Sequence, residues 1–289
     1  MNNLSHMPKD AVAHLRRQIG ALEESGHAGA AVALGLPVLD TALPWGGLPR
    51  GALHEIAGAS GDGAALGFAL LVLSHLGPPP HPDPLPAGER EGPVAKRWEG
   101  EGVGNQPKSS RAHSPARPIL WCRTHSAIAD RGALYGAGIA AAALNPRRVI
   151  FVTVARNADA LWVLEEGLRC DALGAVVGEG VVLDFTASRR LQLAARGGRA
   201  LALLLPPSAA HMGPSAALTR WRVTSDATRR PTQNAVSWRV ALHQCRGGRP
   251  QTWKVEANDA ALRGAVAVPL ADGPLEDASP HTISGSGAG

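Results

Sequence analysis

A glycine-rich stretch, residues 58–63, contains the residue types that proteins use to bind phosphate groups. Gly58 and Gly63 have the spacing of G-x-x-x-x-G-K-[ST], in which backbone N–H groups, a lysine and a hydroxyl hold a nucleotide and its Mg²⁺. The next two residues here are Ala64 and Ala65, so the lysine and the hydroxyl are absent. Asp62 also places a negative charge where a polyanion would bind. The spacing therefore indicates a degenerate phosphate-binding loop.

Loss of the lysine weakens nucleotide binding directly. Each charge-assisted contact contributes about 1.5 to 3 kcal/mol, so its loss lowers affinity roughly ten- to hundredfold. We therefore expect no ATPase activity and no cofactor. An anion site formed by backbone N–H groups alone is the alternative, because those donors do not depend on side chains. The remnant of the loop consists of Gly58, Ser60, Gly61, Gly63, Ala64 and Ala65.

Other residue patterns that could do chemistry are weaker. The eleven histidines include no H-x-x-x-H or H-E-x-x-H pair, and the three cysteines are too widely spaced for a zinc site or a disulfide framework. Ser60 lies in G-A-S-G, which is not the nucleophile elbow G-x-S-x-G. We expect no metal site and no catalytic residue.

A basic region follows residue 200. Residues 201–256 hold eight lysines and arginines but only Asp226 and Glu256 as acids. One interpretation is a patch for DNA phosphates or an acidic partner, with a tryptophan stacking on a base. The other is a strand whose charges face water. The patch would comprise Arg220, Trp221, Arg222, Arg229 and Arg230.

Composition and hydropathy define the class of protein. In 289 residues, 45% are hydrophobic and 18% are charged, which predicts a globular chain rather than a disordered one. No apolar run approaches the length of a membrane helix, and residues 1–26 lack the apolar core of a signal peptide. We expect a cytoplasmic protein.

The loop is positioned by alternating strands and helices. A strand at Leu53 to Ala57 and a helix at Ala64 to Leu76 flank it. Later come apolar runs typical of buried strands, a small-residue helix around 133–143 and two longer helices. This alternation predicts an α/β fold with a mainly parallel sheet flanked by helices. The predicted strands are 118–122, 147–154, 172–179 and 200–205, and the longer helices are 157–170 and 187–198.

A β-hairpin is predicted near the C-terminus. Val236, Trp238, Val240 and Leu242 alternate on one face of the first strand, and TWKVE forms the second strand after a glycine turn. Trp238 and Trp253 are candidate cross-strand partners.

The remaining segments divide the chain into regions. Residues 1–30 are predicted to form an N-terminal helical arm, 31–77 plus 118–256 the core, and 257–289 a largely flexible tail. Residues 78–117 contain nine prolines and five glycines, which predicts a disordered insertion, with a docking loop as the alternative. The arm carries one apolar seam, which either packs on its own domain or docks on a neighbouring protein; it consists of Val12, Leu15, Ile19 and Leu22.

The residues around the loop resemble a known group of proteins. The stretch 39–58 contains Leu39-Asp40, Gly46-Gly47-Leu48-Pro49, Glu55-Ile56 and Gly58, as found where the core of RecA-type recombinases begins. With the degenerate loop, LRRQIGALE, ALGAVVGEG, LDFTASRRLQLAAR and TRWRV, the chain resembles the ImuA family of the damage-inducible mutagenesis cassette. The resemblance covers most of the chain except the insertion and the tail, and it implies a RecA-like core.

The sequence pattern of RecA-type recombinases matches two further residues of this chain to catalytic positions. Arg123 falls about where the recombinases have a catalytic glutamate, and Gly178 falls where the Walker B aspartate would lie. Glu179 is adjacent but points to the other side of its strand. Both carboxylate roles are therefore expected to be vacant, which argues further against an ATPase.

The resemblance implies a function in SOS-induced translesion synthesis. By this resemblance, the chain is expected to act as a non-catalytic adaptor. It would bind RecA and ImuB, a Y-family polymerase-like protein, and through ImuB an error-prone replicative-type polymerase. A nucleoid-associated location in the cytoplasm is expected, with DNA contacted either directly, through the basic patch, or only through these partners. Two rival functions are a weak ATP-dependent recombinase paralogue, which would bind nucleotide, and a SulA-like inhibitor of cell division, which would bind the tubulin-like division protein.

Overall fold

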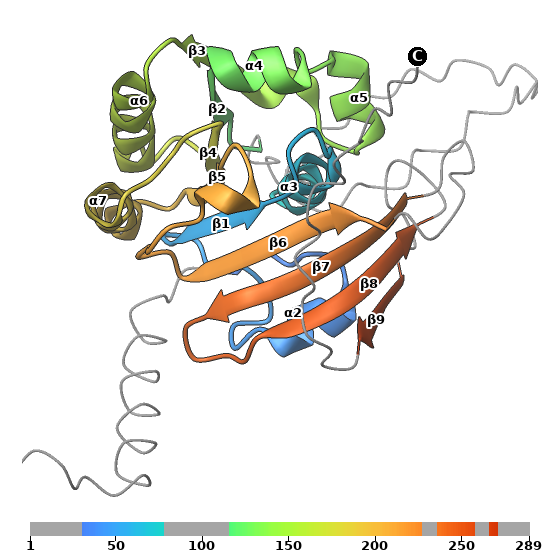
Figure 1. The fold of residues 1–289 in the computed structure, drawn as a ribbon. Coiled ribbons are helices and arrows are strands. Elements are labelled where there is room, and N and C mark those ends of the chain that lie inside the picture. The colour runs from blue at the N-terminus through green and yellow to red at the C-terminus, as the bar shows by residue number, and fades with distance from the viewer. Residues whose placement is uncertain (1–30, 78–115, 227–235, 258–265, 271–289) are drawn as a thin grey trace, which may run out of the picture.

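The computed structural model describes residues 31–77, 116–226, 236–257 and 266–270 (Figure 1). The predicted arm, most of the predicted insertion, Arg229, Arg230 and residues 271–289 lie outside the described residues.

The helices are α2 (Pro37–Ala42), α3 (Ala64–Ser74), α4 (His125–Arg131), α5 (Gly136–Ala141), α6 (Asn157–Arg169) and α7 (Phe185–Gly197), with 3-10 turns η1 (Pro146–Arg148) and η2 (Ala209–His211). The strands are β1 (Leu53–Ala57), β2 (Ile119–Thr124), β3 (Val149–Val154), β4 (Ala175–Glu179), β5 (Leu201–Leu205), β6 (Thr219–Ser225), β7 (Val236–Cys245), β8 (Gln251–Ala257) and β9 (Val266–Leu270).

The named strands form one sheet in the order β3-β2-β4-β5-β1-β6-β7-β8-β9. Neighbours from β3 to β6 are parallel, and neighbours from β6 to β9 are antiparallel. This arrangement confirms the prediction of an α/β fold with a mainly parallel sheet and antiparallel strands near the C-terminus.

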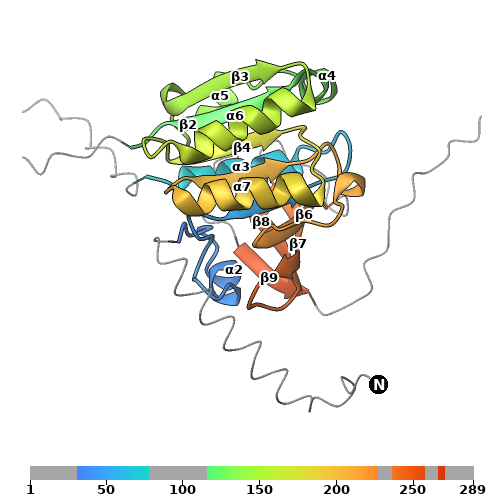
Figure 2. The ribbon, with the colours of Figure 1, turned by 90° about the vertical axis from the view of Figure 1, so that its left-hand side faces the viewer.

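Helices cover both faces of the parallel part (Figure 2). On one face, Leu164 of α6 and Leu191 of α7 pack with Leu53 and Leu204 of the sheet. On the other face, α3 and α5 pack with the sheet through a second apolar cluster that continues beneath the antiparallel strands. α3 is apolar on nearly all sides, as expected for a helix enclosed by other elements.

Three tryptophans fill the core of the antiparallel part. Trp221, Trp238 and Trp253 are buried, and the rings of Trp221 and Trp253 are 6.2 Å apart. Trp253 lies opposite Val240, and Trp238 lies opposite Val255, so the two hairpin tryptophans are diagonal rather than direct cross-strand partners. The register is set by the turn, which the apolar alternation does not determine.

Three segments differ from the sequence prediction. β3 is an edge strand with Ile150 and Phe151 about half exposed, because an apolar run does not reveal its position in the sheet. The predicted small-residue helix 133–143 is present as the shorter α5, and α4, which ends before Gly132 at φ +74°, was not predicted. β9 pairs with β8 inside the range predicted to be a flexible tail.

Candidate functional site

The glycine loop connects β1 to α3 at the carboxyl-terminal edge of the parallel sheet. Gly58 lies where the loop crosses β6: a Cβ at this position would be 3.1 Å from the Val223 carbonyl oxygen and 3.1 Å from Ala65 Cβ. Gly61 has φ +72°, which disfavours other residues. Ser60, Gly61 and Gly63 are exposed, whereas Ala64 and Ala65 are buried. The predicted strand, loop and helix are therefore present in the structure.

The carboxylate of Asp62 binds within its own loop. Its Oδ1 atom accepts a hydrogen bond from the backbone N–H of Ala64 at 2.9 Å, at the start of α3. Its two oxygens also accept hydrogen bonds from the N–H and the hydroxyl of Ser225, each at 2.7 Å. A helix N-terminus attracts anions because its first N–H groups lack partners within the helix. Here a side chain of the loop supplies that anion and ties the loop to the end of β6.

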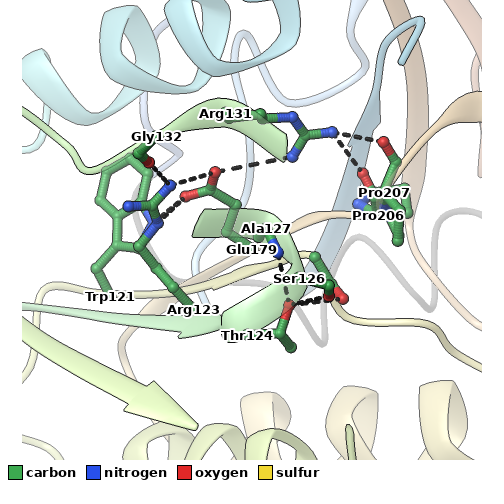
Figure 3. A network of polar contacts seen from close by, with 11 residues as sticks. Trp121, Arg123, Thr124, Ser126, Ala127, Arg131, Gly132, Glu179, Pro206 and Pro207 are labelled. Atoms are coloured by element: carbon green, nitrogen blue, oxygen red, sulfur yellow. Dashed lines mark hydrogen bonds and ion pairs between the residues drawn. The ribbon is translucent and has the colours of Figure 1, made fainter. Parts of the chain in front are cut away.

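A second polar cluster lies at the same edge, on the ends of β2 and β4 (Figure 3). The fully buried carboxylate of Glu179 accepts hydrogen bonds from Arg123 Nε at 2.8 Å, Arg123 Nη2 at 3.1 Å and Trp121 Nε1 at 3.0 Å. Arg131 of α4 approaches the same carboxylate, with Nη1 3.7 Å from Oε1. Arg131 also donates to the carbonyl oxygens of Pro206 and Pro207, after β5. The cluster therefore joins three strand ends to α4.

Gly178 and Glu179, at the end of β4, lie on opposite faces of the sheet. Gly178 faces α6, because a Cβ there would lie 2.7 Å from a methyl group of Leu164 and 2.7 Å from a methyl group of Leu204. Glu179 faces the opposite side of the sheet, where Trp121 and Val177 pack in the cluster that includes α3. The carboxylate of Glu179 thus lies on the face of the sheet that α3 covers, and arginines neutralise it. Gly178 and Glu179 therefore face opposite sides of β4, as strand alternation predicted.

The residues predicted as a basic patch are only partly together on the surface. Arg220 is mostly buried and donates to the carboxylate of Glu55 at 2.8 Å. Trp221 is fully buried, so its ring is not available to stack on a base in this structure. Arg222 is half-buried on the same strand, and Arg229 and Arg230 lie outside the described residues. The side of β6 that carries the tryptophan faces the core.

The described residues offer few other places for a ligand. None of their His, Cys, Asp and Glu side chains form a group of three or more that could hold a metal ion. A hollow of about 10 Å³, with room for about one water molecule, lies between Glu55, His211 and Ser215, and apolar residues near the ends of β4 and β5 line it. It is far smaller than the pockets that hold nucleotide-sized ligands. Within the described part of the chain, no helix has the length and apolar character needed to cross a membrane.

The chain is similar to a protein named ImuA in two strains of Caulobacter vibrioides. It is 28% identical to Protein ImuA of strain NA1000 / CB15N over 246 residues, which cover 79% of this chain and 84% of that protein. The same figures hold for Protein ImuA of strain ATCC 19089 / CIP 103742 / CB 15. This similarity supports a relation to ImuA. No protein-family model matches the chain.

Two features of the site were missed in the sequence. Asp62 was predicted to repel a polyanion, but the residues it binds, Ala64 and Ser225, were not identified. Asp62 precedes the N-cap residue Gly63, so it is outside the usual capping position, and its contact with α3 had only the general preference for acids near a helix N-terminus as a signal. The ion pair between Arg123 and Glu179 depends on the β2–β4 register, which no local pattern reveals.

Proposed function

We propose that this chain belongs to the ImuA family and acts as a non-catalytic, RecA-like adaptor in SOS-induced translesion synthesis. The observation that carries the proposal is the similarity to Protein ImuA over 79% of the chain. The order of the parallel strands and the loop between β1 and α3 are consistent with a RecA-like core. Through the family resemblance, its partners are RecA, an ImuB-type polymerase-like protein and, indirectly, an error-prone polymerase near the nucleoid.

Two features of the site favour an adaptor over an ATPase. The N–H of Ala64 already binds the carboxylate of Asp62, so a phosphate would have to displace a tethered anion. The carboxylate of Glu179 already binds Arg123, so a metal ion would have to displace a guanidinium. Displacing Arg123 would leave the buried carboxylate of Glu179 without its main partner, which is costly, whereas Asp62 is partly exposed and would keep its hydrogen bonds from Ser225. We therefore expect the loop to keep one conformation whether or not nucleotide is present.

The test is co-purification of the chain with the ImuB-type protein and with RecA encoded in the same genome. The adaptor function predicts stable capture of the ImuB-type protein that is equal with and without ATP and Mg²⁺. RecA is pre-assembled with a nucleotide analogue in all samples, so that nucleotide effects on RecA itself stay constant. Failure to capture either protein would contradict the proposal. Capture of the tubulin-like division protein instead, or ATP turnover by the chain, would favour one of the rival functions.

A further inference from the structure

The amino-terminal edge of the parallel sheet, opposite the glycine loop, carries a row of arginines. The first residues of neighbouring parallel strands are in register: Ile119 pairs with Val149 and with Ala175, and Ala175 pairs with Leu201. Arginines precede four of the five strands β3, β2, β4, β5 and β1 by at most three residues. Because these strands start at one edge, the arginines lie along that edge. The arginine row consists of Arg147, Arg148, Arg117, Arg199 and Arg50.

Three guanidinium groups of the row are anchored on two neighbouring backbone segments, which the hydrogen bond from Gly174 N–H to the Pro118 carbonyl oxygen joins. Arg148 donates from Nε at 3.3 Å and Nη2 at 2.9 Å to the carbonyl oxygen of Arg117. Arg117 donates from Nη1 to the carbonyl oxygen of Asp171 at 3.0 Å, and Arg50 donates from Nη1 to the carbonyl oxygen of Gly174 at 3.0 Å. All of these acceptors are neutral carbonyl groups. The contacts hold the three cations close together without neutralising them.

Within the described part of the chain, no member of the row forms an ion pair, and Asp171 is the acid whose backbone lies among these arginines. The ion pairs there involve other arginines and Lys254. Burial and then the charges of Arg117 and Arg148 lower the pKa of the Arg50 guanidinium, which reflects this crowding. Like charges held close together destabilise a fold, and a bound anion would relieve the repulsion.

We propose that the arginine row binds the phosphodiester backbone of DNA. Neighbouring strands lie about 4.8 Å apart, so the row spans about 19 Å from β3 to β1. One strand of B-DNA carries about five or six phosphates over that length. Planar guanidinium groups bind phosphate oxygens through paired N–H donors. This surface is separate from residues 220–222, and the inference does not depend on the proposed function.

The chemistry of the edge favours nucleic acid over a protein partner. Protein interfaces have an apolar centre with aromatic or large aliphatic side chains. The residues of this edge that lie beside the arginines are small, namely Gly51, Pro118, Gly174 and Ala200. Phosphate contacts carry no sequence information, so binding is sequence-independent and sensitive to salt.

The experiment measures binding of the full chain to a fluorescent DNA duplex of random sequence by anisotropy, at a series of salt concentrations. With four to five phosphate contacts, the logarithm of the binding constant falls with the logarithm of salt concentration with a slope of about −4. The variant Arg117→Ala/Arg147→Ala/Arg199→Ala changes only exposed members of the row. Its slope shrinks in magnitude by about 3, and its affinity at 0.1 M salt falls by about a hundredfold or more.

A matched control variant removes the same charge elsewhere. Arg156→Ala/Arg169→Ala/Arg189→Ala changes three exposed arginines of the α6–α7 surface, two of which pair with acids. It keeps the wild-type slope if the row is the site. The proposal is overturned if the wild-type chain does not bind DNA at low salt, or if the row variant keeps the wild-type slope while both variants melt like the wild type. Row-dependent binding of labelled poly-glutamate without binding of DNA would assign the surface to an acidic protein segment instead.

Discussion

The guanidinium of Arg123 and the carboxylate of Glu179 form a paired contact, with Nε 2.8 Å from Oε2 and Nη2 3.1 Å from Oε1. The two residues lie opposite each other on neighbouring parallel strands, and the carboxylate is fully buried. A buried charge without a partner is strongly unfavourable, so each side chain makes the other tolerable in the core. The pair therefore links β2 to β4 at the edge where the glycine loop begins.

Breaking this pair on one side is expected to destabilise the fold. Arg123→Met leaves a buried carboxylate with only Trp121 and a distant Arg131, and we expect a loss of about 3 to 5 kcal/mol in the free energy of unfolding. Urea denaturation measures the loss. The double variant Arg123→Met/Glu179→Leu should lose less than the sum of the two single variants, because neither charge is left unpaired. Additive losses would contradict the coupling. Arg156→Ala, at an exposed ion pair, is the control and should change little.

Restoring the missing side chains of the loop is expected not to create an ATPase. In Ala64→Lys/Ala65→Thr the first N–H of α3 still binds Asp62, and Glu179 still binds Arg123. Adding Asp62→Gly frees the first N–H of α3, but the carboxylate of Glu179 stays neutralised by Arg123. The triple variant should therefore also be inactive. Phosphate release above the background of the wild-type chain would show that the loop is closer to a working site than the contacts indicate. Circular dichroism checks that the variants remain folded, since both alanines are buried.

Local patterns in the sequence predicted β1, the loop and α3 well, because apolar spacing and glycine placement determine these elements over short distances. They also predicted α6 to within a residue or two. The hairpin was predicted as a motif, while its register was not, since the positions of Trp238 and Trp253 depend on the length of the turn.

The contacts that define the site were beyond such patterns. Asp62 and Ser225 are 163 positions apart, and they meet only because β6 lies beside β1. Trp221 lies between two arginines in the sequence, which suggested a surface patch, but strand alternation turns its ring into the core. Which face of a strand is buried depends on the neighbouring layers. The opposite facing of Gly178 and Glu179 was predicted, because side chains alternate along a strand.

The cysteines are expected to differ sharply in reactivity. Burial raises the pKa of Cys122 and of Cys245 from the ordinary value of 9.0 to about 11, whereas Cys170 is exposed. At pH 8 about one in a thousand of the buried thiols is ionised, so Ellman's reagent should modify only Cys170 in the folded chain. The Cys170→Ser variant should not react until denaturant is added, and rapid reaction of that variant would contradict the burial.

The same shifts predict how stability depends on pH. The folded chain binds the thiol protons of Cys122 and Cys245 more tightly than the unfolded chain does. The free energy of unfolding should therefore decline as pH rises from about 9 towards 11. Denaturation midpoints of the wild type and of Cys122→Ala over this range measure the effect. An equal decline in the wild type and in Cys122→Ala would mean that other groups cause the pH dependence.

The arm, which lies outside the described residues, gives a test tied to the proposed function. On the docking interpretation of the arm, charging the predicted seam with Leu15→Glu/Ile19→Glu should weaken RecA binding and leave the melting temperature of the core unchanged. Surface plasmon resonance with immobilised RecA filaments measures the binding. The control Arg16→Glu/Arg17→Glu changes charge in the same stretch off the seam. Unaltered binding by the seam variant would refute docking through the arm.

Deleting residues 78–115 is expected to leave the core intact. The two ends of this segment meet in the structure: a Cβ placed on Gly77 would lie 3.8 Å from Cβ of Ala116. A short Gly-Ser connection can therefore replace the segment without moving α3 or β2. Because a shorter loop costs less entropy to close, by about 0.6 kcal/mol for each halving, stability should be equal or slightly higher.

The effect of the deletion on the melting temperature depends on whether it ends before or after Arg117. The sequence pattern placed the end of the insertion at Arg117, but this residue accepts two hydrogen bonds from Arg148 and donates one to Asp171. A deletion of 78–117 removes these contacts at the start of β2, so its melting temperature should be lower than that of the shorter deletion. Differential scanning calorimetry of both variants compares them directly. A fall of many degrees in the shorter variant would mean that the segment contributes to the stability of the core, because the join itself introduces no strain.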